Sequence, residues 1–126
     1  MPIATYQISE DQRNQILFRE ESHFCDLKSA EITPAKLSRT IAAFANADGG
    51  ELLVGISEDR ATGTRTWAGF SNVEAANGHL QTFEQFFPLG NDFEYCFLQS
   101  EGSVGLVLQV QVRKTPDIKR ASDGEA

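Results

Sequence analysis

The sequence has little cysteine and little histidine, the residues that most often bind structural metals. It has two cysteines, Cys25 and Cys96, which lie far apart in the sequence, and two histidines. No Cys-x-x-Cys pair occurs, which argues against a zinc site and favours reduced, half-buried strand cysteines over a disulfide. With 126 residues, the chain is long enough to bury a core without either device, and we expect a single domain over residues 1–126.

Long apolar runs are missing as well. No stretch approaches the roughly 20 apolar residues of a membrane span. The first residues, MPIATYQISEDQ, lack a basic segment followed by an apolar one, as a secretory signal would have. We therefore expect a cytoplasmic protein.

Positive charge is scarce. Eleven Lys and Arg stand against eighteen Asp and Glu, and the net charge is −7. This argues against a protein that binds nucleic acid through overall charge, because affinity for phosphate comes largely from neutralising it. A local basic face can still coexist with an acidic surface elsewhere, and bound cations would offset a carboxylate-rich metal site.

The central stretch, IAAFANADGGELLVGISED over residues 41–59, organises the prediction. It reads as the end of a helix, a stop at Gly49-Gly50, and a strand containing Leu52, Leu53, Val54 and Ile56. A nearly unbroken aliphatic run is typical of a strand covered on both faces. We expect this strand to continue to the acids Glu58 and Asp59.

The other expected elements follow from caps and periodicity. Ser9 and Gln12 form a possible capping box for a helix over 9–19, and Thr33-Pro34 begins a helix whose stripe runs from Leu37 to Ala45. The remaining expectations are a strand between Glu21 and Lys28, an exposed, mobile loop RATGTRT over 60–66, a strand over 67–70, a helix from Asn72 to about Phe87, a turn PLGND over 88–92, and a hairpin of 93–99 with 104–112.

Acidic residues recur at the ends of two expected strands. If the strands are neighbours, Glu21, Asp26 and Glu58 or Asp59 converge at one edge of a sheet. Carboxylate oxygens are the ligands that Mg²⁺ and Mn²⁺ prefer, and such an ion activates water and stabilises charge on a phosphoryl group. Lys28, on the same strand face as Asp26, could contact phosphate. The spacing alone fits equally well with solvated surface carboxylates.

Other polar residues favour structural roles. Gly49-Gly50 is a helix stop, because the chain lacks the G-x-x-x-x-G-K-S/T pattern of a phosphate-binding loop. We expect His23 to be a strand residue and His79 a surface helix residue. Ser22 and Ser57 have no evident base partner, which argues against a hydrolase triad.

Two ordered motifs carry a resemblance to a known family. They are Glu21-Ser22-x-x-x-Asp26-Leu27-Lys28 and, further on, Ala43-Phe44-Ala45-Asn46-x-Asp48-Gly49-Gly50 with its aliphatic strand. Together they resemble the Schlafen/AlbA-like DNA-binding domain family over most of the chain. Three positions depart from the family pattern: Asp26 replaces a glutamate, Leu27 an aromatic residue, and Glu58 an aspartate.

The resemblance implies an α+β fold with a small mixed, largely antiparallel sheet packed with about three helices. It also implies nucleic-acid binding and, in the Schlafen branch, cleavage of transfer or ribosomal RNA by a metal-dependent site of three carboxylates. Other relatives are regarded as DNA-binding transcriptional regulators. The polar tail, which ends without a cap, is similar to the family's approach to a final strand, so we expect the chain to be truncated from a longer protein.

Two hypotheses follow, and the sequence does not decide between RNA and DNA as the partner. In the first, the domain is a metal-dependent endoribonuclease in which Mg²⁺ or Mn²⁺ is bound by the catalytic acids Glu21, Asp26 and Glu58. The residues expected to contact its RNA are Lys28, Lys36, Arg39, Arg60 and Arg65. In the second, it is a non-catalytic DNA-binding or dimerising regulator that uses the 60–66 loop and Arg113, Lys114, Lys119 and Arg120. A homodimer is expected by analogy only.

Overall fold

The structure, a computed structural model, describes residues 3–22, 24–86 and 92–114. Its helices are α1 (Glu10–Leu17), α2 (Pro34–Asn46) and α3 (Asn77–Phe86), with a 3₁₀ turn η1 (Val73–Ala76) before α3. Its strands are β1 (Thr5–Ile8), β2 (Cys25–Lys28), β3 (Gly50–Val54), β4 (Ile56–Glu58), β5 (Arg65–Trp67), β6 (Phe93–Ser100) and β7 (Leu106–Val112). The α+β prediction is therefore confirmed.

The main sheet has five strands in the order β1-β6-β7-β3-β2, and β4 and β5 form a separate pair. The central pairings β6–β7 and β7–β3 are antiparallel. The outer pairings β1–β6 and β2–β3 are parallel. The sheet is thus mixed, and β2 is an edge strand.

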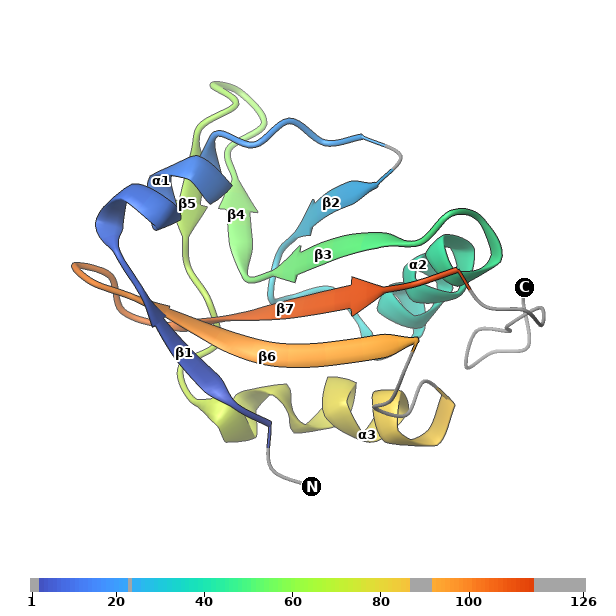
Figure 1. The fold of residues 1–126 in the computed structure, drawn as a ribbon. Coiled ribbons are helices and arrows are strands. Elements are labelled where there is room, and N and C mark those ends of the chain that lie inside the picture. The colour runs from blue at the N-terminus through green and yellow to red at the C-terminus, as the bar shows by residue number, and fades with distance from the viewer. Residues whose placement is uncertain (1–2, 23, 87–91, 115–126) are drawn as a thin grey trace.

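The sheet is covered on both faces (Figure 1). One face packs against α2 and α3, and the other packs against α1 and the β4–β5 hairpin. In β3, Leu52 and Val54 belong to the first core, whereas Leu53 belongs to the second. All three are fully buried, so the prediction of a strand covered on both faces is confirmed.

The predicted helix starts are confirmed. The Ser9 side chain accepts from the Gln12 backbone N–H, and the Gln12 side chain accepts from the Ser9 N–H. Thr33 caps α2 by accepting from the Lys36 N–H, with Pro34 at the first helical position. Each cap satisfies a backbone donor that lacks a partner within its helix.

The course of the chain after β3 differs from the prediction. The strand ends at Val54, and Gly55, with φ of 124°, turns the chain out of the main sheet. The Gly55 N–H donates to the Lys28 carbonyl over 2.7 Å, and its own carbonyl accepts from the Gly69 N–H over 2.7 Å. Glu58 therefore ends β4 of a separate hairpin instead of the central strand.

That hairpin also corrects the predicted 60–66 loop. Arg65 and Thr66 belong to β5, where Arg65 pairs with Glu58 and Thr66 with Ser57. The strand expected at 67–70 begins and ends earlier, and Phe70 forms only an isolated bridge with Leu106. The connecting turn is thus confined to the residues between Glu58 and Arg65.

Histidine 79 is a second correction. Its side chain is 7% exposed, although a surface position was predicted. The Nε2 atom lies 2.6 Å from the Ile32 carbonyl, and the ring meets Phe70 edge-on. A histidine can be buried when one ring nitrogen finds a backbone partner and the rest of the ring packs with apolar groups.

Other predictions have mixed outcomes. The 93–99 and 104–112 hairpin is confirmed as β6 and β7, and Cys25 and Cys96 are free thiols in β2 and β6. Strand β1 was not predicted. His23, Phe87, residues 88–91 of the predicted turn, and the tail from 115 lie outside the described residues. No described helix has the length and apolar character that crossing a membrane requires.

The Gly55 bend leads to the first prediction. A Cβ at this position would lie 2.9 Å from the Gly69 Cα, in a backbone conformation that side chains disfavour. We expect Gly55→Ala to lower the free energy of unfolding by about 2–3 kcal/mol, measured by urea denaturation. Gly63→Ala is the matched control, because its φ is 72° but nothing lies within 4 Å; it should cost about 1 kcal/mol. Equal losses in both variants would contradict the crowding argument.

Candidate functional site

Two carboxyl groups lie side by side at the edge of the main sheet. Glu21 comes from the connection between α1 and β2, and Asp26 comes from β2 itself. The two carboxyl groups interact closely enough for Asp26 to raise the pKa of Glu21. Among the described residues, the buried Asp26 Oδ1 has no hydrogen-bond partner.

This proximity changes the acidity of Glu21. The hydrogen bond with Asp26 raises its pKa, and burial and the negative charge of Asp26 act in the same direction. Lys28 and Arg65 oppose the shift with their positive charges. Asp26 therefore favours the protonated form of Glu21.

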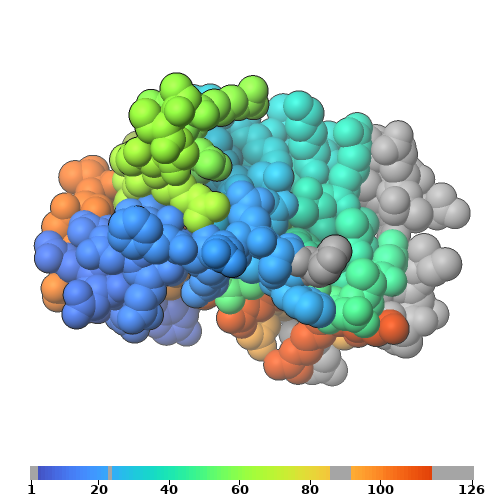
Figure 2. Space-filling view, turned by 90° about the horizontal axis from the view of Figure 1, so that it is seen from above, coloured from blue at the N-terminus to red at the C-terminus, as the bar shows by residue number. Residues whose placement is uncertain are grey.

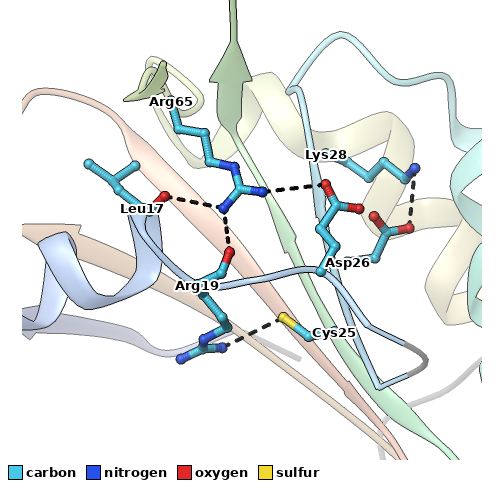
Figure 3. Close-up of polar contacts among 7 residues, drawn as sticks. Leu17, Arg19, Cys25, Asp26, Lys28 and Arg65 are labelled. Carbon is cyan, nitrogen blue, oxygen red and sulfur yellow. Dashed lines mark hydrogen bonds and ion pairs between the residues drawn. The ribbon is translucent and has the colours of Figure 1, made fainter. Parts of the chain in front are cut away.

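Two basic side chains flank the pair (Figure 3). Lys28 Nζ lies 3.1 Å from Asp26 Oδ2. Arg65 Nη2 lies 3.8 Å from Glu21 Oε1. The arrangement is a compact group of two acids and two cations, contributed by β2, the connection before it, and β5.

Arg65 is held more firmly than a surface arginine. Its Nη1 donates to the backbone carbonyls of Leu17, over 3.2 Å, and of Arg19 (Figure 3). Its side chain is only 17% exposed. Arg65 thus fastens the β4–β5 hairpin to the end of α1 and points toward Glu21, a role that its sequence position did not indicate.

A second arginine, Arg19, anchors the connection between α1 and β2 to the main sheet. Arg19 pairs with Glu51 of β3, and its Nη1 lies 3.9 Å from the Cys25 Sγ. Glu51 is the register partner of Cys25 in the parallel β2–β3 pair. Arg19 therefore anchors the chain just before Glu21 to the main sheet.

Glu58 lies apart from the acid pair. It is exposed, and it is directly opposite Arg65 in the antiparallel β4–β5 pair, so both side chains project from the same face of the hairpin. Within residues 3–22, 24–86 and 92–114, no group of three His, Cys, Asp or Glu side chains is arranged to hold a metal ion. The structure brings together Glu21 and Asp26, and it does not add Glu58 to them.

The predicted basic contacts occupy two regions. Lys36 and Arg39 are exposed on α2, and Arg60 is exposed after β4. The hairpin, the segment leading into β2 and α2 all appear on the face shown in Figure 2. Arg113 and Lys114 are exposed after β7, where Arg113 lies 4.0 Å from Glu94. Lys119 and Arg120 lie outside the described residues.

The acid pair fits a hard divalent cation. Such ions take oxygen ligands, and Mg²⁺ is commonly held by one or two carboxylates together with water and substrate phosphate. The buried Asp26 Oδ1, which receives no hydrogen bond from the part of the chain that the structure describes, is an available ligand of this kind. Glu21 and Asp26 are therefore the described residues best suited to bind a metal.

The acid pair predicts a titration. We expect Asp26→Asn to lower the pKa of Glu21, measured by NMR of the side-chain carboxyl, because the variant removes the negative neighbour. A raised folded-state pKa means that the contribution of Glu21 to stability is complete below its ordinary value of 4.5 and is lost as pH rises through the folded value. Glu20→Gln is the control and should leave the titration unchanged. An unaltered Glu21 pKa in the Asp26 variant would refute the coupling.

The chain was compared with protein families and solved structures. A family model described as Schlafen, AlbA_2 matches residues 21–126. No curated protein matches the chain. Among solved structures, the N-terminal domain of a RecG-related protein from Nitrosomonas europaea has a TM-score of 0.63 at 22% identity, over 89% of this chain and 80% of that one.

The DIP2311 protein from Corynebacterium diphtheriae is also similar, with a TM-score of 0.54 and 18% identity. The match covers 84% of this chain but only 20% of DIP2311. At these identities the solved structures show a shared fold and nothing more. The family match covers both motifs and most of the chain, and the chain therefore belongs to the Schlafen, AlbA_2 family.

Proposed function

We propose that this domain binds nucleic acid and is a metal-dependent endoribonuclease acting on structured RNA such as transfer RNA. Its membership of the Schlafen, AlbA_2 family supports nucleic-acid binding. The observation that carries the catalytic part is the Glu21–Asp26 pair, which has a buried oxygen without a donor and a lysine at hydrogen-bond distance.

Glu21 and Asp26 would hold Mg²⁺ or Mn²⁺, with Glu58 as the third proposed ligand from the hairpin. The ion would activate a water molecule and offset the negative charge that develops on the phosphoryl group. Glu58 has to approach from its exposed position opposite Arg65, or water and substrate phosphate complete the coordination instead.

The basic residues have separate roles in this proposal. Lys28 is partly exposed, so its ammonium group can turn from Asp26 to a substrate phosphate. The exposed Lys36, Arg39 and Arg60 steer the RNA backbone toward the acid pair. Arg65 contributes its charge from a fixed position beside Glu21.

A cytoplasmic location and a homodimer complete the proposal. Pairing of two small domains would make a wider groove for a folded RNA. The edge strands β1 and β2 have unpaired backbone groups that can support association.

The metal proposal is tested by a double variant, Glu21→Gln/Asp26→Asn. Both substitutions keep the side-chain shape and remove the charge that attracts the cation. We expect Mn²⁺ affinity, measured by calorimetry, to fall by more than the roughly 10–100-fold that is lost when a group hydrogen-bonded to a metal ligand is replaced. Mn²⁺-dependent cleavage of transfer RNA should be abolished, while the circular dichroism spectrum is unchanged.

The control variant Glu20→Gln/Glu31→Gln removes the same charge from two exposed positions. It should bind Mn²⁺ and cleave RNA as the wild type does. The nuclease proposal fails if the Glu21/Asp26 variant retains wild-type cleavage.

A second candidate function is a non-catalytic, DNA-binding regulatory domain. It is favoured by the adjacent Arg113 and Lys114 after β7, since the Arg113 side chain is 71% exposed and Lys114 is exposed as well. In this proposal Lys119, Arg120 and the cations of the separate hairpin loop also contact DNA. Exposed cations of this kind bind phosphates without needing the acid pair.

Neutralising these cations tests the regulatory function. We expect Arg113→Gln/Lys114→Gln to weaken binding of duplex DNA uniformly across sequences and to reduce the salt dependence of affinity by about one unit of slope for each lost contact. Fluorescence anisotropy at several salt concentrations measures both quantities. An unchanged affinity and slope would exclude this surface from DNA binding.

A further inference from the structure

A surface pocket of about 320 Å³ lies between the start of β2 and the C-terminal part of α2. Its lining residues are mainly apolar, with polar atoms at two positions: Phe24, Thr40, Ala43, Phe44, Ala47 and Asp48. The Phe24 side chain is 56% exposed. The pocket is thus lined by an accessible aromatic residue and two alanines, with Thr40 and Asp48 as its polar residues.

Two lysines lie beyond the pocket, on the same two elements that border it. Residues 29–33 connect the end of β2 to the start of α2, so α2 runs back along the edge strand. Lys36 precedes Thr40 by one helical turn and therefore lies on the same stripe of α2. Lys28 ends β2, and the 29–33 connection leads from it to α2. We call the pocket lining together with Lys28 and Lys36 the groove between β2 and α2.

Asp26 lies between Phe24 and Lys28 in the sequence. Side chains at alternate positions of a strand share a face, so Asp26 and Lys28 project to the same side of β2, about 7 Å apart along the strand. Phe24 lies in the turn just before β2 and lines the pocket from there.

The chemistry of the groove favours a nucleotide over other ligands. Lysine ammonium groups bind phosphate, and an exposed aromatic ring stacks on any nucleobase. The Asp48 carboxylate can accept a hydrogen bond from the amino group of a base. A base can enter such a pocket only when it is unstacked from its own helix, which restricts the ligand to unpaired nucleotides.

We propose that the groove between β2 and α2 binds one unpaired nucleotide, with its base stacked on Phe24 and its phosphate near Lys28 and Lys36. This inference rests on the proposed function, because it assumes that the ligand is nucleic acid. It specifies the substrate class: a loop, bulge or single-stranded end of an RNA, held next to the acid pair. A fully paired duplex does not satisfy the site.

The test compares Phe24→Ala with Tyr6→Ala. Tyr6 is a matched control, because its side chain is 57% exposed and it lies on β1, at the opposite edge of the main sheet. Binding of a labelled single-stranded oligoribonucleotide and of a blunt, fully paired duplex is measured by fluorescence anisotropy. All proteins carry Glu21→Gln/Asp26→Asn, so that cleavage does not interfere and Lys28 and Arg65 keep no acidic partner in the pair. Thermal melting checks the fold of each variant.

We expect Phe24→Ala to weaken binding of the single strand by about tenfold, the effect of losing one stacked base. Phe24→Trp should restore it, and Tyr6→Ala should bind as the Glu21→Gln/Asp26→Asn parent does. Equal binding of the single strand by Phe24→Ala and this parent would overturn the inference while leaving the proposed function intact. Failure of the parent to bind either RNA would overturn both.

The Asp48 carboxylate allows a second, independent test. Cytosine carries an amino group where uracil carries a carbonyl oxygen, so the parent protein should prefer oligocytidine to oligouridine. Asp48→Asn should reduce this preference, because an amide can donate to the uracil oxygen as well as accept from cytosine. A preference unaffected by the substitution would remove Asp48 from the site.

Discussion

Burial of β3 on both faces is the constraint on which the rest of the structure depends. Leu52 and Val54 pack toward α2 and α3, and Leu53 packs toward α1 and the hairpin. A fully buried aliphatic side chain contributes about 1.5–3 kcal/mol, so this strand joins the two layers into one domain. Charged residues are too costly at the fully buried positions of β3, Leu52 to Val54. Asp26 and Lys28 instead lie on β2, whose outer side has no neighbouring strand among the described residues. The acid pair therefore lies at the edge of the main sheet, because the central strands are buried in the core.

The bend at Gly55 decides what lies over that edge. It directs the chain out of the main sheet, so the hairpin can return Arg65 to the connection before β2. The last carbonyls of a helix lack partners within it, and Arg65 supplies donors to the end of α1 through the Leu17 and Arg19 carbonyls. The same guanidinium places a permanent positive charge near Glu21. One side chain therefore satisfies a helix end, fastens the hairpin and influences the acidity of the site.

The features that could be predicted from the sequence are those that local chemistry determines. The Ser9 and Thr33 caps, the buried run in β3 and the β6–β7 hairpin were identified from spacing over a few residues. The adjacency of Glu21 and Asp26 also follows from a short segment. The position of Glu58 was wrong because an apolar run does not show where the backbone leaves a sheet. A single glycine inside a strand pattern was the available signal.

Other features depend on contacts between distant segments. His79 can be buried because its Nε2 group forms a hydrogen bond with the Ile32 carbonyl. Local periodicity in the sequence does not reveal this partner. The residues of β1 are mostly exposed, so their sequence shows no alternation to mark a strand. The inward direction of Arg65 depends on carbonyls more than forty positions earlier in the chain. Such residues become recognisable only after the layers are assembled.

The excess of negative charge in the whole chain has to be reconciled with the proposed nucleic-acid binding at this edge. Screening limits the reach of a charge to about 8–10 Å at physiological salt, so a phosphate bound there would respond to Lys28, Lys36 and Arg65 more than to the net charge of −7. Without a cation, Lys28 and Arg65 are occupied by Asp26 and Glu21. A divalent ion at the acid pair would replace these partners and release the two basic groups toward phosphate. Cation and nucleic acid would then each strengthen the binding of the other, since coupling between two sites is reciprocal.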